Sequence, residues 1–141
     1  MVVSIPVPHP SEDSRPFWDS LRDHVLRLPW CGSCASFQFP PMPGCPACSA
    51  DADAIEWREV AGAGRIHSWF VARHAFHPAF ESDLPYVVAD VVLDEGPRIN
   101  GRIVGVASAD VQADMRVRAV FEDLSAFTRL AFEPADPQEQ A

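Results

Sequence analysis

All four cysteines of the chain lie in two Cys-x-x-Cys pairs, Cys31-Gly-Ser-Cys34 and Cys45-Pro-Ala-Cys48, with ten residues between the pairs. Each pair offers two thiolates from one tight turn, and two such turns close a tetrahedron around Zn²⁺. Four thiolates leave no open coordination position, so the spacing predicts a structural site rather than a catalytic one. Iron fits the same four sulfurs, and two disulfides or free thiols are the alternatives to a metal.

The size and charge of the chain limit its class. Its 141 residues, 48% of them hydrophobic and 22% charged, suit one folded domain, or one domain with a small metal module. The formal net charge is −9 and all 11 basic residues are arginines, which disfavours nucleic acid as a partner. No apolar run approaches the roughly 20 residues of a membrane span, and the N-terminus does not look like a signal peptide. We therefore expect a cytoplasmic, reducing location without membrane contact.

The N-terminal part is expected to hold a flexible arm over residues 1–14 and a helix over residues 15–30. Ser14 suits the N-cap of this helix, Pro16 its first turn and Pro29 its end. One apolar stripe follows a three- and four-residue spacing and contains Phe17, Trp18, Leu21, Val25 and Leu28. Either this stripe packs on the helix's own domain, or Phe17, Trp18 and Leu21 bind a partner.

After a ribbon over residues 31–54, the hydrophobic pattern changes to period two. The expected strands are residues 55–60, 65–73, 86–93, 98–105, 115–121 and 127–132, with a flexible link at 61–64. This pattern predicts a mainly β fold, in which an N-terminal helix and zinc ribbon precede a five-stranded OB-fold-like barrel over residues 55–132. A β-sandwich is the competing arrangement, and residues 133–141 are expected to form a disordered tail.

No catalytic set of residues is evident in the sequence. Gly-x-Ser-x-Gly, phosphate-loop and Rossmann motifs are missing, and no cysteine is left as a nucleophile once four bind metal. The loop between residues 73 and 85 contains His74 and His77, whose spacing allows two metal ligands or a base. Loop histidines in ordinary contact with solvent are the more common case.

An ordered set of motifs between about residues 15 and 135 is more specific than the cysteine spacing. The motifs are Phe17-Trp18, Leu28-Pro29-Trp30-Cys31, Phe39-Pro40-Pro41, Cys45-Pro46-Ala47-Cys48, Trp57, Gly62-Ala63-Gly64-Arg65-Ile66-His67-Ser68, Leu84-Pro85-Tyr86, Leu93-Asp94-Glu95-Gly96-Pro97-Arg98 and Val117-Arg118-Ala119-Val120-Phe121. With them the chain resembles a family in which a rubredoxin-like zinc ribbon precedes an OB-fold domain, and whose members accompany thiolases and other acyl-CoA enzymes. Three positions depart from the family pattern, because glycine is replaced by Ala35, Ser49 and Asp114.

The resemblance implies an accessory subunit that is not catalytic alone. In such assemblies the ribbon and the N-terminal helix dock a thiolase-like partner of the lipid-transfer-protein type, or a hydratase of the hot-dog fold. The OB domain helps to form the acyl-CoA channel, in one case for retro-aldol cleavage of a steroid side-chain CoA thioester. The channel candidates are Arg65, His74, His77 and Arg98, and Arg73 and Arg102 are further arginines that suit the phosphates of coenzyme A.

Two other classes of function remain open from the sequence. Zinc ribbons and OB-folds both occur in nucleic-acid-binding modules, against which the acidic charge counts. The third hypothesis is a self-sufficient lyase acting on a CoA thioester.

Overall fold

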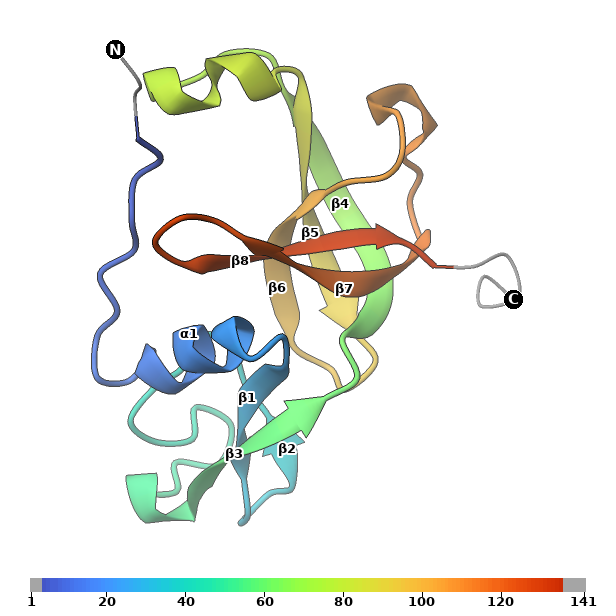
Figure 1. The fold of residues 1–141 in the computed structure, drawn as a ribbon. Coiled ribbons are helices and arrows are strands. Elements are labelled where there is room, and N and C mark those ends of the chain that lie inside the picture. The colour runs from blue at the N-terminus through green and yellow to red at the C-terminus, as the bar shows by residue number, and fades with distance from the viewer. Residues whose placement is uncertain (1–3, 136–141) are drawn as a thin grey trace.

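The N-terminal part of the chain folds around a small antiparallel sheet with the strand order β2-β1-β3, shown at the bottom of Figure 1. The computed structural model describes residues 4–135. In this part α1 spans Arg15–Arg22, β1 Leu26–Cys31, β2 Ser36–Phe37, the 3-10 helix η1 Ala52–Ala54, and β3 Ile55–Val60. The cysteine pairs lie on the turns that follow β1 and precede η1.

The predicted helix over residues 15–30 is wrong after Arg22. The helix ends at that residue, and His24 turns the chain in the left-handed region with a φ of 58°. From Leu26 the chain is a strand that pairs with β3 as far as Cys31. Leu28, which fits a helical spacing from Leu21, is buried instead as part of the two-residue alternation of β1. Backbone pairing with β3 therefore overrides the helical pattern.

The first strand assigned to the barrel belongs to the ribbon instead. β3 pairs with β1, from Leu26 opposite Val60 to Cys31 opposite Ile55, and with no barrel strand in residues 4–135. Its period-two pattern predicts a strand correctly but carries no information on which sheet it joins, because both candidate sheets bury one face. The ribbon sheet thus extends to Val60.

The remaining strands form a closed barrel with the order β4-β5-β6-β8-β7 (Figure 1). β4 spans Ala63–Ala72, β5 Tyr86–Leu93, β6 Arg98–Ile103, β7 Arg116–Asp123 and β8 Thr128–Pro134, with 3-10 helices η2 at Pro78–Asp83 and η3 at Ser108–Asp110. All pairings are antiparallel except that of β6 with β8. This five-stranded closed ring is the OB-fold arrangement, which confirms the predicted fold class and excludes the β-sandwich.

The two termini lie at the limits of what the structure describes. Residues 4–10 of the expected arm have no regular structure, whereas residues 1–3 lie outside the described residues. Of the expected tail, Glu133 and Pro134 are part of β8, and residues 136–141 lie outside the described residues.

The ribbon and the barrel share one hydrophobic core. Leu21 of α1 and Leu28 of β1 are fully buried, in the same cluster as Ile66, Val117 and Phe132 of the barrel. Burying a side chain of this size contributes about 1.5–3 kcal/mol relative to leaving it exposed. Because this core crosses both modules, it fixes their relative position.

The link over residues 61–64 is closely packed rather than flexible. A Cβ on Gly64 would lie 2.4 Å from the carbonyl oxygen of Val92, and one on Gly62, where φ is 76°, would lie 2.8 Å from Cβ of Ala119. Glycine is needed at both positions, so that β4 can start against β5 and β7.

A polar contact joins α1 and the barrel at the edge of the shared core. Nε2 of His24 lies 2.8 and 2.9 Å from the two carboxylate oxygens of Asp123 in β7, and the imidazole stacks on Phe121 with centroids 5.4 Å apart. Thr128 donates a hydrogen bond of 2.7 Å to the same carboxylate. The hydrogen bond with His24, and then that from Thr128, lower the pKa of Asp123 below its ordinary value of 3.8.

This lowered pKa predicts an acid-sensitive contribution to stability. The carboxylate of Asp123 stabilises the fold fully above its pKa in the unfolded chain, and the contribution is lost as pH falls through the lower folded pKa. The difference in unfolding free energy between the wild type and Asp123→Asn should therefore shrink from roughly pH 5 to roughly pH 2. Urea titrations at a series of pH values measure this difference. Both proteins lose metal in acid, so the difference isolates Asp123, and a constant difference would contradict the assignment.

Each of the three positions where the family pattern has glycine is left-handed in this chain. φ is 56° at Ala35, 64° at Ser49 and 63° at Asp114. The backbone N–H groups of Ala35 and Ser49 close the two cysteine turns by donating to the carbonyls of Cys31 and Cys45, at 2.8 and 2.9 Å. The turns thus keep the glycine conformation with side chains for which it is unfavourable.

Restoring glycine should therefore stabilise the ribbon. Ala35→Gly is expected to raise the unfolding free energy by about 1 kcal/mol, because it relieves the left-handed conformation. Ala47→Gly is the matched control, because Ala47 is exposed between Cys45 and Cys48 and has no positive φ. The unfolding free energy of this variant should fall by up to about 1 kcal/mol. Denaturant unfolding of the metal-loaded proteins gives both values. Equal losses in the two variants would show that the strain at Ala35 is negligible.

Candidate functional site

The four cysteines come together as the sequence predicts. Their sulfur atoms all lie within 4.8 Å of one another, with Cys31 and Cys48 3.6 Å apart and Cys34 and Cys45 also 3.6 Å apart. A tetrahedron of sulfurs with metal bonds of about 2.3 Å has edges of about 3.8 Å. All four residues are free cysteines rather than disulfides. The arrangement fits a four-coordinate metal ion, and no other cluster of this kind is found among residues 4–135.

The protonation of the cluster points to a bound cation. The backbone N–H of Cys48 is the main cause that lowers the pKa of Cys45 to about 7. The backbone N–H of Ala50 lowers the pKa of Cys48, but desolvation and the sulfurs of Cys31, Cys45 and Cys34 outweigh it and raise this pKa to about 12. Thiolates packed this closely repel one another, so all four can ionise at neutral pH only around a cation.

Of the three predicted partner-binding residues, two are in the core. Phe17 is 7% exposed and Leu21 fully buried, whereas Trp18 is half-buried and packs edge-on against Phe17 and Phe127 at 5.4 and 6.3 Å between centroids. These three residues line one wall of a groove of about 370 Å³ between α1 and the barrel. The rest of the lining comes from Phe39, Val88, Ile99, Asn100, Gly101, Arg102, Arg129 and Leu130.

The predicted channel residues do not form one site. Arg65 lies at the start of β4, donates to the carbonyl of Asp114 at 3.1 Å and lines a cavity of about 260 Å³ that contains none of the other three. His74 is exposed and packs edge-on against Phe76. Nδ1 of His77 caps η2 by accepting the N–H of Ala79 at 3.1 Å. Arg98 lies 3.5 Å from Asp90.

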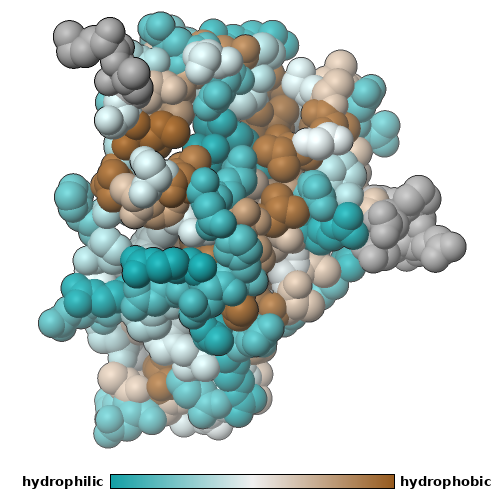
Figure 2. Space-filling view, viewed as in Figure 1, coloured by the Kyte–Doolittle hydropathy of each residue, from teal (hydrophilic) through white to brown (hydrophobic). Residues whose placement is uncertain are grey.

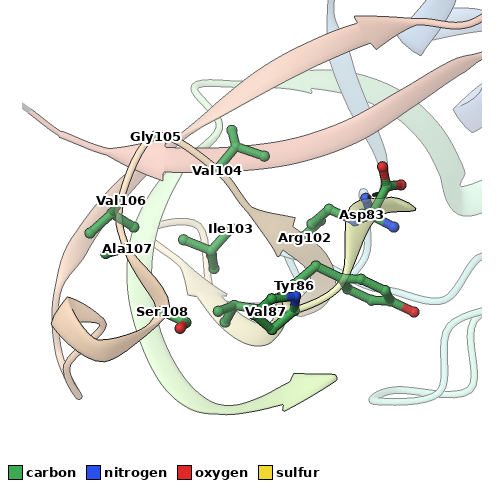
Figure 3. A pocket seen from close by; sticks show the side chains of 11 residues that line it. Asp83, Tyr86, Val87, Arg102, Ile103, Val104, Gly105, Val106, Ala107 and Ser108 are labelled. Carbon is green, nitrogen blue, oxygen red and sulfur yellow. Dashed lines mark hydrogen bonds and ion pairs between the residues drawn. The ribbon is translucent and has the colours of Figure 1, made fainter. Parts of the chain in front are cut away.

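Arg102 lines a further cavity, and the sequence indicates this residue only as one of several candidate anion-binding arginines. The volume of this cavity is about 440 Å³, and Figure 3 shows Arg102, Asp83 and Tyr86 on one side of it and the 104–108 turn on the other. The Arg102 side chain is only 14% exposed, donates to Asp83 at 3.0 Å and lies 4.1 Å from the centroid of the Tyr86 ring. The sequence did not indicate Asp83 and Tyr86 as residues of a binding cavity. The one available signal was that Tyr86 is the single tyrosine of the chain.

The guanidinium of Arg102 has five N–H donors, and the hydrogen bond with Asp83 uses one of them. It lies beside apolar walls that include Val87, Ile103 and Val106. A largely buried guanidinium in a cavity lined by both polar and apolar groups suits an anionic group.

Among residues 4–135, no helix has the length and apolar character needed to cross a bilayer.

Comparison with known proteins accounts for both modules. Residues 18–54 match the rubredoxin-like zinc ribbon domain of ChsH2, and residues 57–122 match its C-terminal OB-fold domain. The chain is 38% identical to a probable enoyl-CoA hydratase alpha subunit of Thermomonospora curvata, over 96% of this chain and 42% of that protein. It is 34% identical to the 3-oxo-4,17-pregnadiene-20-carboxyl-CoA hydratase alpha subunit of Mycobacterium tuberculosis, over 90% of this chain and 39% of that protein.

The chain thus spans about two fifths of the length of these curated relatives. It also matches a solved structure of the Ltp2-ChsH2(DUF35) aldolase with a TM-score of 0.81 and 32% identity, covering 91% of this chain and 98% of that chain. Two domain matches in the same order, and a structural match over nearly the whole of a related chain, establish the relationship. The chain belongs to the ChsH2 DUF35 family, in which a rubredoxin-like zinc ribbon is joined to an OB-fold domain.

Proposed function

We propose that this chain is an accessory subunit of an acyl-CoA enzyme, which docks a thiolase-like partner and helps to form the channel for the acyl-CoA. The observation that carries the proposal is the similarity to the aldolase structure, which extends over 98% of the related chain and so includes both ribbon and barrel. The partner supplies the acid, base or nucleophile, and this chain supplies shape and excludes water from the reacting bond.

The reaction that fits best is retro-aldol cleavage of a steroid side-chain CoA thioester. Two names support this: the solved relative is an aldolase, and the Mycobacterium tuberculosis relative acts on a steroid carboxyl-CoA. The runner-up is a subunit of an enoyl-CoA hydratase, because the two relatives described above are named hydratase alpha subunits and are more than twice as long as this chain. The partner that binds distinguishes the two: a thiolase-fold subunit supports the aldolase, and a hot-dog-fold subunit supports the hydratase.

Docking is assigned to the groove beside α1. Its lining is mostly apolar, and the aromatic rings of Phe17, Trp18 and Phe39 form one end of it. Trp18 is half-buried in this aromatic set, and the exposed part of its ring offers contact area to a partner. The cavity at Arg102 is the proposed contact for an anionic group of the acyl-CoA, with Arg65 and Arg98 further along the barrel.

We assign Zn²⁺ as the resident ion of the four-cysteine site, with iron as the alternative, and a reducing cytoplasmic location in which the cysteines stay free. When bound, the metal supplies folding energy to the ribbon and no chemistry to a substrate. Cys31 and Cys34 hold it from the first turn, and Cys45 and Cys48 from the second.

Removal of one ligand tests the metal site. Cys31→Ser and Cys45→Ser are expected to reduce bound zinc from one ion per chain to a small fraction, because metal-binding energy is folding energy in such modules. Elemental analysis of the purified proteins measures the zinc, and far-ultraviolet circular dichroism measures the fold. Ser33→Ala, at an exposed position in the first turn, is the control and should keep the zinc. Iron in place of zinc would change the ion but keep the site, whereas full zinc in both variants would rule the site out.

Removal of the Trp18 side chain tests the docking groove. Trp18→Ala should weaken binding to the purified thiolase-fold subunit of the same host by about 2 kcal/mol, roughly 30-fold in Kd, as for a buried aromatic anchor. Isothermal titration calorimetry measures the affinity, and thermal unfolding shows whether the variant is folded. Met42→Ala, at an exposed apolar residue of the ribbon, is the matched control and should bind normally. Failure of the wild-type chain to bind any thiolase-fold or hydratase subunit of the host would contradict the proposed function.

A further inference from the structure

β4 is paired along its whole length on one side only. On the β5 side its partners run from Gly64 opposite Leu93 to Ala72 opposite Tyr86. On the other side, β7 pairs only with residues 63–65, and the backbone of Ile66 bonds to Met115 and Asp114 at 3.0 and 2.8 Å. Beyond Ile66, no backbone hydrogen bond reaches this second edge from any other segment of residues 4–135. Residues 67–72 therefore present an unpaired strand edge of about 20 Å.

This edge lacks the devices that usually protect a free strand. The side chains of residues 68–72 carry no charge, and proline does not occur among them. Trp69 and Phe70 are 37% and 59% exposed, and Phe76 in the following loop is 95% exposed. These three are among the five exposed large hydrophobic residues of the described chain. The β-bulge between Ile66 and Ser68 lies before the apolar stretch and does not interrupt it.

The face of β4 beside this edge borders the docking groove. Val88 pairs with Phe70 across the β4–β5 hairpin, and both Val88 and Asn100 line the groove beside α1. The same two residues line a second hollow, of about 250 Å³, together with Trp69 and Phe70. On the side of the molecule that Figure 2 views, brown apolar surface is divided by hydrophilic groups. A partner seated in the groove thus extends over the β4–β5 face as far as β4, whose free edge lies on the side away from β5.

The charges along β4 select the kind of occupant. Residues 65–74 contain Arg65, His67, Arg73 and His74 and no acidic residue, in a chain whose net charge is −9. If two copies of this chain paired antiparallel about a two-fold axis at Trp69, Arg65 would face Arg73. Like charges directly opposite are destabilising in such pairs, so this register disfavours a second copy, whereas an acidic segment would meet Arg73 favourably.

We propose that an extended segment of the thiolase-like partner, apolar at its centre and acidic at its ends, adds to the free edge of β4 as a further strand. This inference rests on the proposed function. Backbone hydrogen bonds to residues 67–72 provide the pairing, Trp69 and Phe70 contact the segment's side chains on opposite faces, and Arg73 meets an acidic end.

The test measures amide exchange and affinity on the same complex. With the purified thiolase-fold subunit of the host as the probe, hydrogen–deuterium exchange of residues 67–72 should slow at least roughly tenfold on binding. Phe70→Lys should raise Kd at least roughly tenfold, whereas Met42→Lys, at an exposed residue of the ribbon, should leave it unchanged. Arg73→Glu should slow association and weaken its salt dependence, and Arg73→Lys should restore both.

The outcomes separate this inference from the proposed function. If the wild-type complex forms, but Phe70→Lys binds normally and residues 67–72 exchange equally in free and bound protein, the edge is not the docking strand and the accessory role stands. If sedimentation shows a dimer of this chain that Phe70→Lys abolishes, the occupant is a second copy and the inference is overturned. If the wild type binds no thiolase-fold subunit, both proposals are overturned.

Discussion

Four cysteine sulfurs within 4.8 Å of one another need a cation to neutralise them, and the N-terminal half of the molecule depends on this constraint. Cys31 ends β1, the strand whose Leu26 and Leu28 pack in the core that the ribbon shares with the barrel. The effect of the metal therefore extends beyond the two cysteine turns. It fixes the end of β1, and β1 with α1 fixes how the ribbon sits on the barrel.

That fixed placement explains how a molecule without an evident catalytic set can still be specific. The groove beside α1 lies between this helix and residues of β5, β6 and β8, and two of its lining residues, Val88 and Asn100, also line the hollow beside Trp69 and Phe70 of β4. Arg102 lines this groove and also the cavity of about 440 Å³. The proposed docking groove and the proposed anion-binding cavity therefore meet at Arg102, as we expect of an accessory subunit beside an acyl-CoA channel.

Much of this was predictable from the sequence, and the misses have physical causes. The metal ligands followed from spacing, β3 from alternation and β5 from its run of β-branched apolar residues, because all three patterns are local. Leu28 was wrongly assigned to the helix, because a spacing of seven residues from Leu21 suits one helix face as well as a helix followed by a strand. The cavity at Arg102 could not be predicted, because Asp83 and Tyr86, which contact Arg102, are distant from it in the sequence. The left-handed Ala35 and Ser49 were foreseeable only through the family resemblance.

The central claim is that the chain shapes a channel for chemistry performed by its partner. The most direct measurement is the consumption of a steroid side-chain CoA thioester by this chain alone, by the thiolase-fold subunit alone and by their equimolar mixture. We predict fast turnover by the mixture and none by this chain alone. Turnover by the purified chain at the rate of the mixture would contradict the account and establish a self-sufficient lyase.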